Sequence, residues 1–312
     1  MGGKITVIGS YMADVTMYVD EFPRAAEAVF ATHSRVSSGG KGSNQAVAAH
    51  RLGAEVFLIA KLGMDIFADM ALDFYRKEGM STQYISKTEM SHTGIANITV
   101  NNKTGENKIA LDPGANLLLS GEDVYKAERV ISKSDILLMQ NETSTDALYA
   151  ALELAKKYGI PTVFDPAPAK EIPVDILKAA TYITPNQYEA EFYFGYPADN
   201  LKNATSVVKL MYFSGYRNPI ITVGSEGAVY WGDHGYNIVK GIKCRALDTT
   251  GAGDAFNGAL AVALAEGMIV TDALEFANAA ASISVTQYGA ASSMPNRMDV
   301  DDVYLHIYGK DY

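Results

Sequence analysis

The sequence predicts an α/β protein in which a mostly parallel central sheet is covered by helices on both faces. Short β-branched runs alternate along the chain with longer segments rich in alanine and leucine. This alternation is typical of units in which a helix connects two parallel strands. Two regions, 15–36 and 95–111, instead alternate apolar and polar residues, as antiparallel strands with one open face do. We therefore predict a large α/β core that carries a small β-sheet.

The elements of the core are expected in the following order along the chain. Buried strands are predicted at residues 5–8, 56–60, 136–139, 162–164, 182–184 and 220–223. Helices are predicted at residues 43–52, 67–78, 146–158, 204–213, 254–266 and 272–287. Glycines follow directly after several of these helices, where a left-handed cap is favoured: Gly53, Gly79, Gly159 and Gly267.

The small sheet is predicted from strands at 15–19, 29–36, 95–100 and 108–111, with a turn at 101–106. We expect it to be a lid over an active site. The alternative is a surface β-meander with no gating role. The expected organisation is one domain, 1–312, with the lid formed by about 13–38 and 93–112 inserted into it.

Composition excludes several classes of protein. The net charge of −10 lacks the basic footprint of a nucleic-acid binder, although backbone amides can still hold ATP phosphates on an acidic protein. A single cysteine, Cys244, excludes a disulfide framework and fits a reducing compartment. Neither a signal peptide nor a membrane span is evident. We expect a cytoplasmic protein with no nucleic-acid or membrane partner.

The most informative segment is 248–258, DTTGAGDAFNG. Small residues at 251–253 stand directly before a long apolar helix, and Asp254 lies at its first turn. Amides at a helix start attract anions, and a carboxylate beside them suits a general base next to a phosphate. The glycine spacing does not match a dinucleotide fingerprint, and the acid would repel a pyrophosphate. The segment therefore predicts phosphoryl transfer; the alternative for Asp254 is an acid that only complements the helix dipole.

A second glycine-rich segment, 39–46, reads GGKGSNQA. Its glycines let the backbone approach a ligand closely. Ser43 is expected to be the N-cap of the next helix, and Lys41 and Asn44 could face a small polyhydroxy or anionic ligand. The segment lacks the upstream glycine and the spacing of a Walker A loop. A plain glycine turn is the alternative.

Two weaker signals follow predicted strands. Asn186 and Glu189 are one helical turn apart and could hold a hydrated Mg²⁺, but spacing alone favours a capping box. Residues 222–227 form a glycine-bounded turn at a strand end, which is a ligand position in parallel sheets or a plain β-turn. The five histidines show no zinc-ligand spacing.

Taken in order, these motifs resemble the PfkB family of carbohydrate kinases, and within it the ribokinase branch. The resemblance spans nearly the whole chain and is carried by residues 9–14, 39–49, 114–116, 165–169, 184–189, 224–227 and 248–260. It implies a ribokinase-like three-layer sandwich that phosphorylates the primary 5-hydroxyl of a pentose, D-ribose and/or 2-deoxy-D-ribose. The implied ligands are the sugar, ATP, Mg²⁺ and a monovalent cation, K⁺. It also implies a homodimer formed through the lid.

The resemblance further implies roles for individual residues. Asp254 corresponds to the catalytic base, and the amides of Gly251, Ala252 and Gly253 to an anion hole. The sugar-binding positions are Met12, Asp14, Gly40, Lys41, Asn44 and Glu142. The ATP positions are Asn186, Thr222, Gly224, Ser225, Gly227 and Asn278, with Glu189 acting on Mg²⁺. The positions of the K⁺ site are Asp248, Thr250, Ser284, Gln287, Gly289 and Ser293.

Several residues depart from the family pattern. Met12 stands where ribokinases usually carry a sugar-binding Asn, and a thioether is a weak acceptor and no donor. Deoxyribokinases resemble the chain at this position, so we expect 2-deoxy-D-ribose to be accepted at least comparably to ribose. Ala26 replaces a glycine of the lid, which puts the shape of that turn in question. Asn141 and Gln187 also differ, at positions expected to be peripheral.

Gln287 replaces a usual basic residue, and we expect K⁺ activation to survive this change. Two alternatives to a pentose kinase remain. The first is a PfkB kinase for another substrate, such as fructose, a sugar phosphate or a nucleoside. The second is a non-catalytic sugar- or nucleotide-binding regulator.

Overall fold

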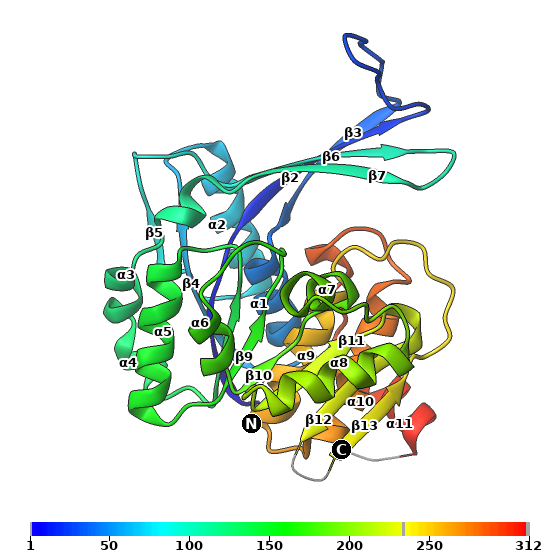
Figure 1. Ribbon diagram of the computed structural model, residues 1–312. Coiled ribbons are helices and arrows are strands. Elements are labelled where there is room, and N and C mark those ends of the chain that lie inside the picture. The colour runs from blue at the N-terminus through cyan, green and yellow to red at the C-terminus, as the bar shows by residue number, and fades with distance from the viewer. Residues whose placement is uncertain (1, 233–234, 310–312) are drawn as a thin grey trace.

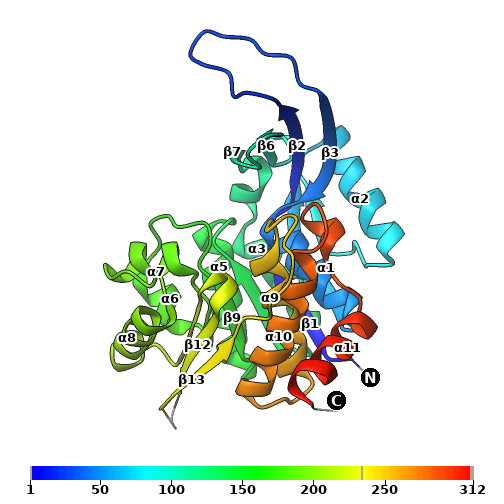
Figure 2. The ribbon, with the colours of Figure 1, turned by 90° about the vertical axis from the view of Figure 1, so that its right-hand side faces the viewer.

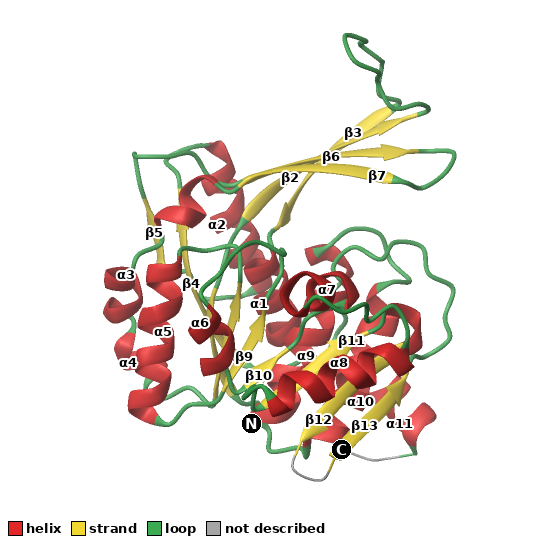
Figure 3. Cartoon of the chain, viewed as in Figure 1, coloured by secondary structure: helices red, strands yellow, loops and turns green. Residues whose placement is uncertain are grey.

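The computed structural model describes residues 2–232 and 235–309, and its body is built on one large sheet (Figures 1 and 3). Within these residues the strand order is β13-β12-β11-β10-β9-β8-β1-β4-β5. The strands are β1 (Lys4–Ile8), β4 (Glu55–Leu62), β5 (Ile85–Lys87), β8 (Ile136–Gln140), β9 (Thr162–Asp165), β10 (Tyr182–Ile183), β11 (Asn218–Thr222), β12 (Gly227–Gly232) and β13 (Gly235–Lys240). Every strand predicted for the core is present.

Pairing is parallel from β5 to β11, as predicted, and becomes antiparallel at one edge. There β11, β12 and β13 form a meander that the sequence pattern did not indicate. Gly227 has a φ of 113° at the turn into β12, and it lets β13 approach closely, since a Cβ there would lie 2.0 Å from the Val239 carbonyl oxygen. The sheet is therefore mostly parallel with an antiparallel edge.

Helices cover both faces of this sheet, which confirms the predicted layers. One face carries α1 (Lys41–Arg51), α2 (Ile66–Glu78), α9 (Ala252–Ala265), α10 (Val270–Ser284) and α11 (Arg297–Tyr308). The other carries α3 (Gly121–Lys126), α4 (Glu128–Ile131), α5 (Thr145–Tyr158), α6 (Val174–Ala179), α7 (Gln187–Phe194) and α8 (Leu201–Phe213). Successive strand side chains enter opposite cores, as the period of a strand requires: Val7 and Leu138 face one set of helices, Ile8 and Leu137 the other.

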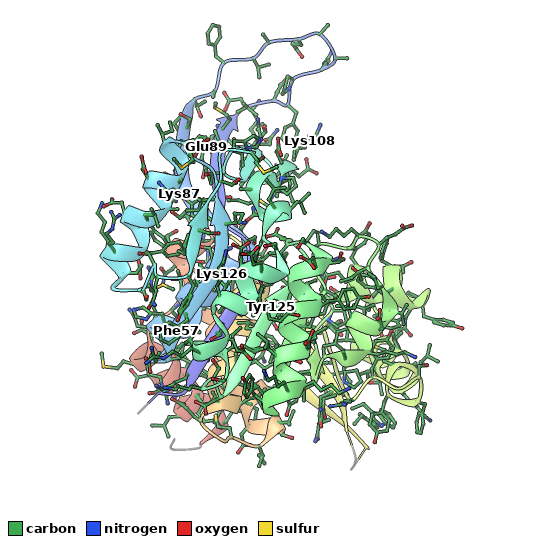
Figure 4. The ribbon with its side chains drawn as sticks, turned by 90° about the vertical axis from the view of Figure 1, so that its left-hand side faces the viewer. Phe57, Lys87, Glu89, Lys108, Tyr125 and Lys126 are labelled. Atoms are coloured by element: carbon green, nitrogen blue, oxygen red, sulfur yellow. The ribbon has the colours of Figure 1, made fainter. Side chains whose placement is uncertain are left out.

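A second sheet, the lid sheet, stands away from the body near the carboxyl ends of the parallel strands (Figures 1 and 2). Its strand order is β3-β2-β6-β7, with β2 (Met12–Val19), β3 (His33–Gly39), β6 (Ile95–Asn101) and β7 (Asn107–Asp112). Figure 4 labels Lys87 and Glu89 on the chain that runs from β5 toward the lid sheet, and Lys108 on β7.

Two expectations for this sheet need correction. β2 and β6 pair in parallel, so the sheet is mixed rather than purely antiparallel. The strand expected to begin at residue 29 begins at His33. Ala26, which replaces a family glycine, keeps the left-handed conformation with a φ of 63°, so the turn retains a shape that glycine adopts more easily.

Hydrogen bonds from Asn116 join the two chain segments that connect the lid sheet to the body. Its Oδ1 accepts from the Tyr11 amide at 2.9 Å and its Nδ2 donates to the Tyr11 carbonyl at 2.8 Å. Tyr11 directly precedes β2, and Asn116 lies shortly after β7. The two ends of the lid sheet are therefore held together. No helix among the described residues is long and apolar enough to cross a membrane.

Candidate active site

The segment 39–42 passes so close to residues 9–12 that it requires glycine. A Cβ on Gly40, whose φ is 89°, would lie 2.7 Å from the Met12 nitrogen, and one on Gly42 would lie 2.3 Å from the Ser10 nitrogen. Helix α1 begins at Lys41, with Gly40 as its N-cap. The expectation that Ser43 is the N-cap is therefore wrong, because the positive φ of Gly40 lets the helix start earlier. Ser43 is instead buried inside the helix.

Glu142, which follows β8, binds this close approach from the other side. Its Oε2 accepts from the Lys41 amide at 2.9 Å and from the Ser10 hydroxyl. Burial raises its pKa, and the Lys41 cation and these hydrogen bonds oppose that increase. The structure thus brings Gly40, Lys41 and Glu142 together, and it adds Ser10, whose contact with Glu142 the motif alone did not indicate.

Asp254 lies in the first turn of α9 and is only 5% exposed. Its Oδ2 accepts from Asn44 Nδ2 at 2.8 Å and its Oδ1 from Gln45 Nε2 at 3.0 Å. The two helices approach closely because Gly258 leaves room, since a Cβ there would lie 2.6 Å from the Ala48 Cβ. Two motifs that are about 210 residues apart in sequence thus share one hydrogen-bond network. An acid that served the helix dipole alone would have no need of these side-chain donors.

The loop before Asp254 leaves open space beside Gly253. Gly251 has a φ of 80° and caps α9. A Cβ on Gly253 would meet no other atom within 4 Å, so the space beside this residue is free for a ligand. The Ala252 amide donates to the Thr249 carbonyl at 3.2 Å. A ligand that takes all three predicted amides must therefore displace this long hydrogen bond.

Carboxylates surround Lys41. Its Nζ lies 3.8 Å from Asp165 Oδ2. Burial opposes its charge, but Asp165, Asp254 and Glu142 raise the pKa of the ammonium group. Burial, with Lys41 opposing and Glu189 adding to it, raises the pKa of Asp165 to about 8. Asp165 was not predicted as a site residue; the available signals were its place directly after a buried strand and the resemblance of segment 165–169 to the family.

Asp14, on β2, faces the same region. Burial, followed by the charges of Glu142 and Asp254, raises its pKa to about 7, and Arg35 acts in the opposite direction. A Cβ on Gly39 would lie 2.1 Å from Asp14 Oδ2, which explains the glycine there. Arg35, on β3, donates to the Ser292 hydroxyl at 3.2 Å, so it connects the lid sheet to the segment that carries the predicted cation site.

The predicted nucleotide residues form a second group at the ends of β10 and β11. Asn186 pairs with Thr222 through an isolated bridge. Asn186 also caps α7, and Glu189 returns a hydrogen bond to it, so the capping box favoured by spacing is present. Glu189 is 5% exposed. Next to this pair, the turn between β11 and β12 carries Gly224, Ser225 and Gly227.

Asn278 connects α10 to the neighbouring strand, since its Nδ2 donates to the Lys240 carbonyl at 2.6 Å. Thr184 links the nucleotide group to α9, the helix that carries Asp254. Its hydroxyl donates to Asn257 on that helix at 2.8 Å.

The predicted cation residues lie in the 248–250 segment and in residues 284–293, which Asp248 joins. Asp248 accepts from the Thr250 amide and from the Gly289 amide, both at 2.9 Å. Ser284 and Gln287 are joined through backbone at 3.1 Å, and Ser293 is buried nearby in the same segment. Asp248 thus orders a loop rich in carbonyl oxygens, which are ligands of hard cations.

Asn141 was expected to be peripheral, but it supports the loop after β9. Its Nδ2 donates to the Pro168 carbonyl and to the Tyr193 hydroxyl, each at 3.1 Å. This loop begins at Asp165, so Asn141 is part of the frame around Lys41.

Known proteins resemble this chain in sequence over nearly its whole length. A family model described as pfkB family carbohydrate kinase matches residues 3–297. The chain is 38% identical over 306 residues to a ribokinase of Haemophilus influenzae, covering 98% of this chain and 100% of that protein. It is 34% identical over 293 residues to a deoxyribokinase of Salmonella typhi, covering 94% and 95%.

The structure of an Arabidopsis thaliana ribokinase complexed with ribose and ATP superimposes with a TM-score of 0.88 at 27% identity, covering 97% of this chain and 99% of that one. The match confirms the predicted ribokinase-like α/β fold with a separate small sheet.

Proposed function

The chain belongs to the pfkB family of carbohydrate kinases, and we propose that it transfers the γ-phosphoryl group of ATP to the primary 5-hydroxyl of a pentose, D-ribose and/or 2-deoxy-D-ribose. The observation that carries the proposal is the position of Asp254. Its side chain is buried in the first turn of α9, directly after residues 251–253, and it accepts a hydrogen bond from Asn44 of the glycine-rich segment 39–46. The ribokinase and deoxyribokinase relatives support a pentose as the substrate.

In this mechanism Asp254 takes the proton of the attacking hydroxyl. Phosphoryl transfer passes through a loose transition state, so the base acts late. The amides at 251–253 and the positive end of α9 stabilise charge on the transferring group. Asp14, Lys41, Asn44 and Glu142 hold the sugar, and the lid closes over it to exclude water that would compete as acceptor.

The residues expected to hold the nucleotide and its metal fit those roles. We place ATP along Asn186, Thr222, Gly224, Ser225, Gly227 and Asn278. Glu189 is a buried carboxylate whose oxygens already accept from the Asn186 amide and side chain at 2.8 and 2.9 Å. Each oxygen keeps a further lone pair for the waters of a hydrated Mg²⁺. When bound, Mg²⁺ neutralises phosphate charge.

We place K⁺ in the loop of Asp248, Thr250, Ser284, Gln287, Gly289 and Ser293. Asp248 already orders this loop through two amides. A cation there would stabilise the loop that leads into 251–253.

A panel of sugars with Mg-ATP tests the proposed function directly. ADP release should depend on D-ribose or 2-deoxy-D-ribose and should rise when K⁺ replaces a bulky organic cation. Preference for fructose or a nucleoside would assign a different substrate within the family. Binding of sugar and ATP without turnover would instead indicate a regulator.

Sugar affinity should increase with pH because of Asp14. Its pKa is raised to about 7, so the carboxyl holds a proton below that pH. Sugar hydroxyls donate best to the ionised form, so binding should release the proton and the Kd should fall about tenfold between pH 6 and pH 8. Calorimetric titration with the preferred pentose measures this. Asp14→Asn should bind more weakly and without the pH dependence; a flat wild-type profile would contradict the assignment.

Met12 should set the preference between the two pentoses. It is 3% exposed at the start of β2, where a thioether accepts only weakly from a ring hydroxyl and cannot donate to one. In Met12→Asn the ratio of kcat/KM for ribose to that for 2-deoxyribose should rise about tenfold, which is the value of one hydrogen bond. Initial rates with both sugars give the ratio in wild type and variant. An unchanged ratio would refute the role.

We also propose a homodimer formed through the lid sheet. Met17 and Val36 are 40% and 51% exposed and share a face of that sheet, because Val15, next on the same side as Met17, pairs with Val36. Light scattering should give about twice the mass of one chain, and Met17→Lys with Val36→Lys should give monomer. Ile269→Lys, an equally apolar exposed site on the body, serves as control. A wild-type monomer would exclude the dimer.

A further inference from the structure

Gln45 lies between two carboxyl groups and makes three hydrogen bonds, all to buried partners. Its Nε2 donates to Asp165 Oδ2 at 2.8 Å and to Asp254 Oδ1 at 3.0 Å. Its Oε1 accepts from Gln140 Nε2 at 2.7 Å. Both glutamines have no exposed surface. A side-chain amide has two N–H donors, and each of them is assigned here to a different carboxyl group.

The two carboxyl groups and Gln140 together set which way this amide points. If the Gln45 amide were turned over, its oxygen would face Asp165 and Asp254, and its NH₂ group would face the NH₂ group of Gln140. Both encounters leave buried polar groups unpaired, which is unfavourable. Since Gln45 is on α1 and Gln140 is the last residue of β8, the arrangement is fixed by two regular elements of the body.

We infer that Gln45 is a positioning residue for phosphoryl transfer, with its amide oriented by Gln140 and by the two carboxyl groups. Asn44 and Gln45 each hold one oxygen of Asp254, so the plane of that carboxylate is fixed from two sides. The Gln45 amide also separates Asp254 from Asp165. The inference rests on the proposed role of Asp254 as the base. Because Gln45 has no exposed surface, it acts through Asp254 rather than on the sugar.

Replacement of Gln45 should separate kcat from KM. Gln45→Met keeps a similar length and removes every hydrogen bond, so kcat should fall roughly 10- to 100-fold through a misplaced base. The KM of the pentose should stay within about threefold, since Asn44, Lys41 and Glu142 remain. Gln45→Glu places a third carboxyl group between two others, so one proton is retained there. The acid limb of its kcat profile should move to higher pH.

Gln140→Glu tests whether the orientation of the Gln45 amide affects Asp254, without changing Asp254 itself. Once the introduced carboxyl group ionises, the Gln45 amide must turn to donate to it, and the amide oxygen then faces Asp254. The kcat should therefore drop at high pH and recover at low pH, where the O–H of the new acid can donate a hydrogen bond to Gln45 Oε1. Gln83→Glu, the same change at an exposed position, is the control and should match wild type.

The outcomes distinguish this inference from the proposed function. If wild type does not phosphorylate any pentose, the proposed function fails. If wild type is active, either of two results for Gln45→Met overturns the positioning role. The first is a kcat within twofold of wild type, and the second is a fall in kcat together with a comparable rise in the KM of the pentose. If Gln45 variants do not fold, the profile of Gln140→Glu decides, and a profile identical to that of wild type overturns the inference.

Discussion

Replacing Asp254 with asparagine should lower kcat by roughly 10²–10⁴ and leave the KM of the sugar nearly unchanged. The amide keeps the shape of the side chain but cannot take a proton from the attacking hydroxyl. The site around it should remain folded, although the new NH₂ group must share the space with the donors of Asn44 and Gln45. Steady-state rates with the preferred pentose and Mg-ATP measure the change.

A matched control distinguishes catalysis from a helix-dipole effect. Asp272 is also an acid in the first turn of a long helix, α10. Asp272→Asn removes a comparable dipole interaction, which is worth about 0.3–1 kcal/mol, at a place not assigned to catalysis. It should leave kcat within about twofold of wild type. If Asp254→Asn behaved like Asp272→Asn, Asp254 would be only a dipole acid.

The core of the fold could be predicted from the sequence because its signals are local. β-branched runs such as 136–139 and long helices such as 146–158 carry their own period. The pairing direction within the lid sheet could not be predicted, since alternation looks the same in parallel and antiparallel strands. β2 and β6 are about 80 residues apart and pair in parallel. Helices as short as α4, of 4 residues, do not complete a detectable period.

The proposed site could be predicted where one motif carries the chemistry and not where folding joins separate segments. Asp254 and the glycines before it predict an anion site from the sequence alone. Gln45 and Asp165 make their contacts only when α1, β9 and α9 meet. Ser43 shows the opposite error: an N-cap residue type in a suitable place was overruled by the backbone of Gly40, which the sequence does not specify.

Replacing Gly40 with alanine should both destabilise the protein and impair sugar binding. The residue has a φ of 89° and a ψ of 136°, which side-chain-bearing residues avoid at a cost of about 1–3 kcal/mol. The added Cβ would also lie 2.7 Å from the Met12 nitrogen and 2.9 Å from the Tyr11 Cα. These are backbone atoms that cannot rotate away. The free energy of unfolding should fall by about 2–4 kcal/mol, as measured by urea denaturation.

The same change should lower kcat/KM for the sugar about 100-fold or more, because Met12 and the Lys41 amide would both be displaced. Gly53→Ala separates this steric effect from backbone strain. Gly53 also has a positive φ, 97°, but a Cβ there would meet no atom within 4 Å. It should cost only about 1–2 kcal/mol and leave kcat/KM unchanged. Equal losses in the two variants would mean that strain alone matters at Gly40, and that its contact with Met12 does not shape the sugar site.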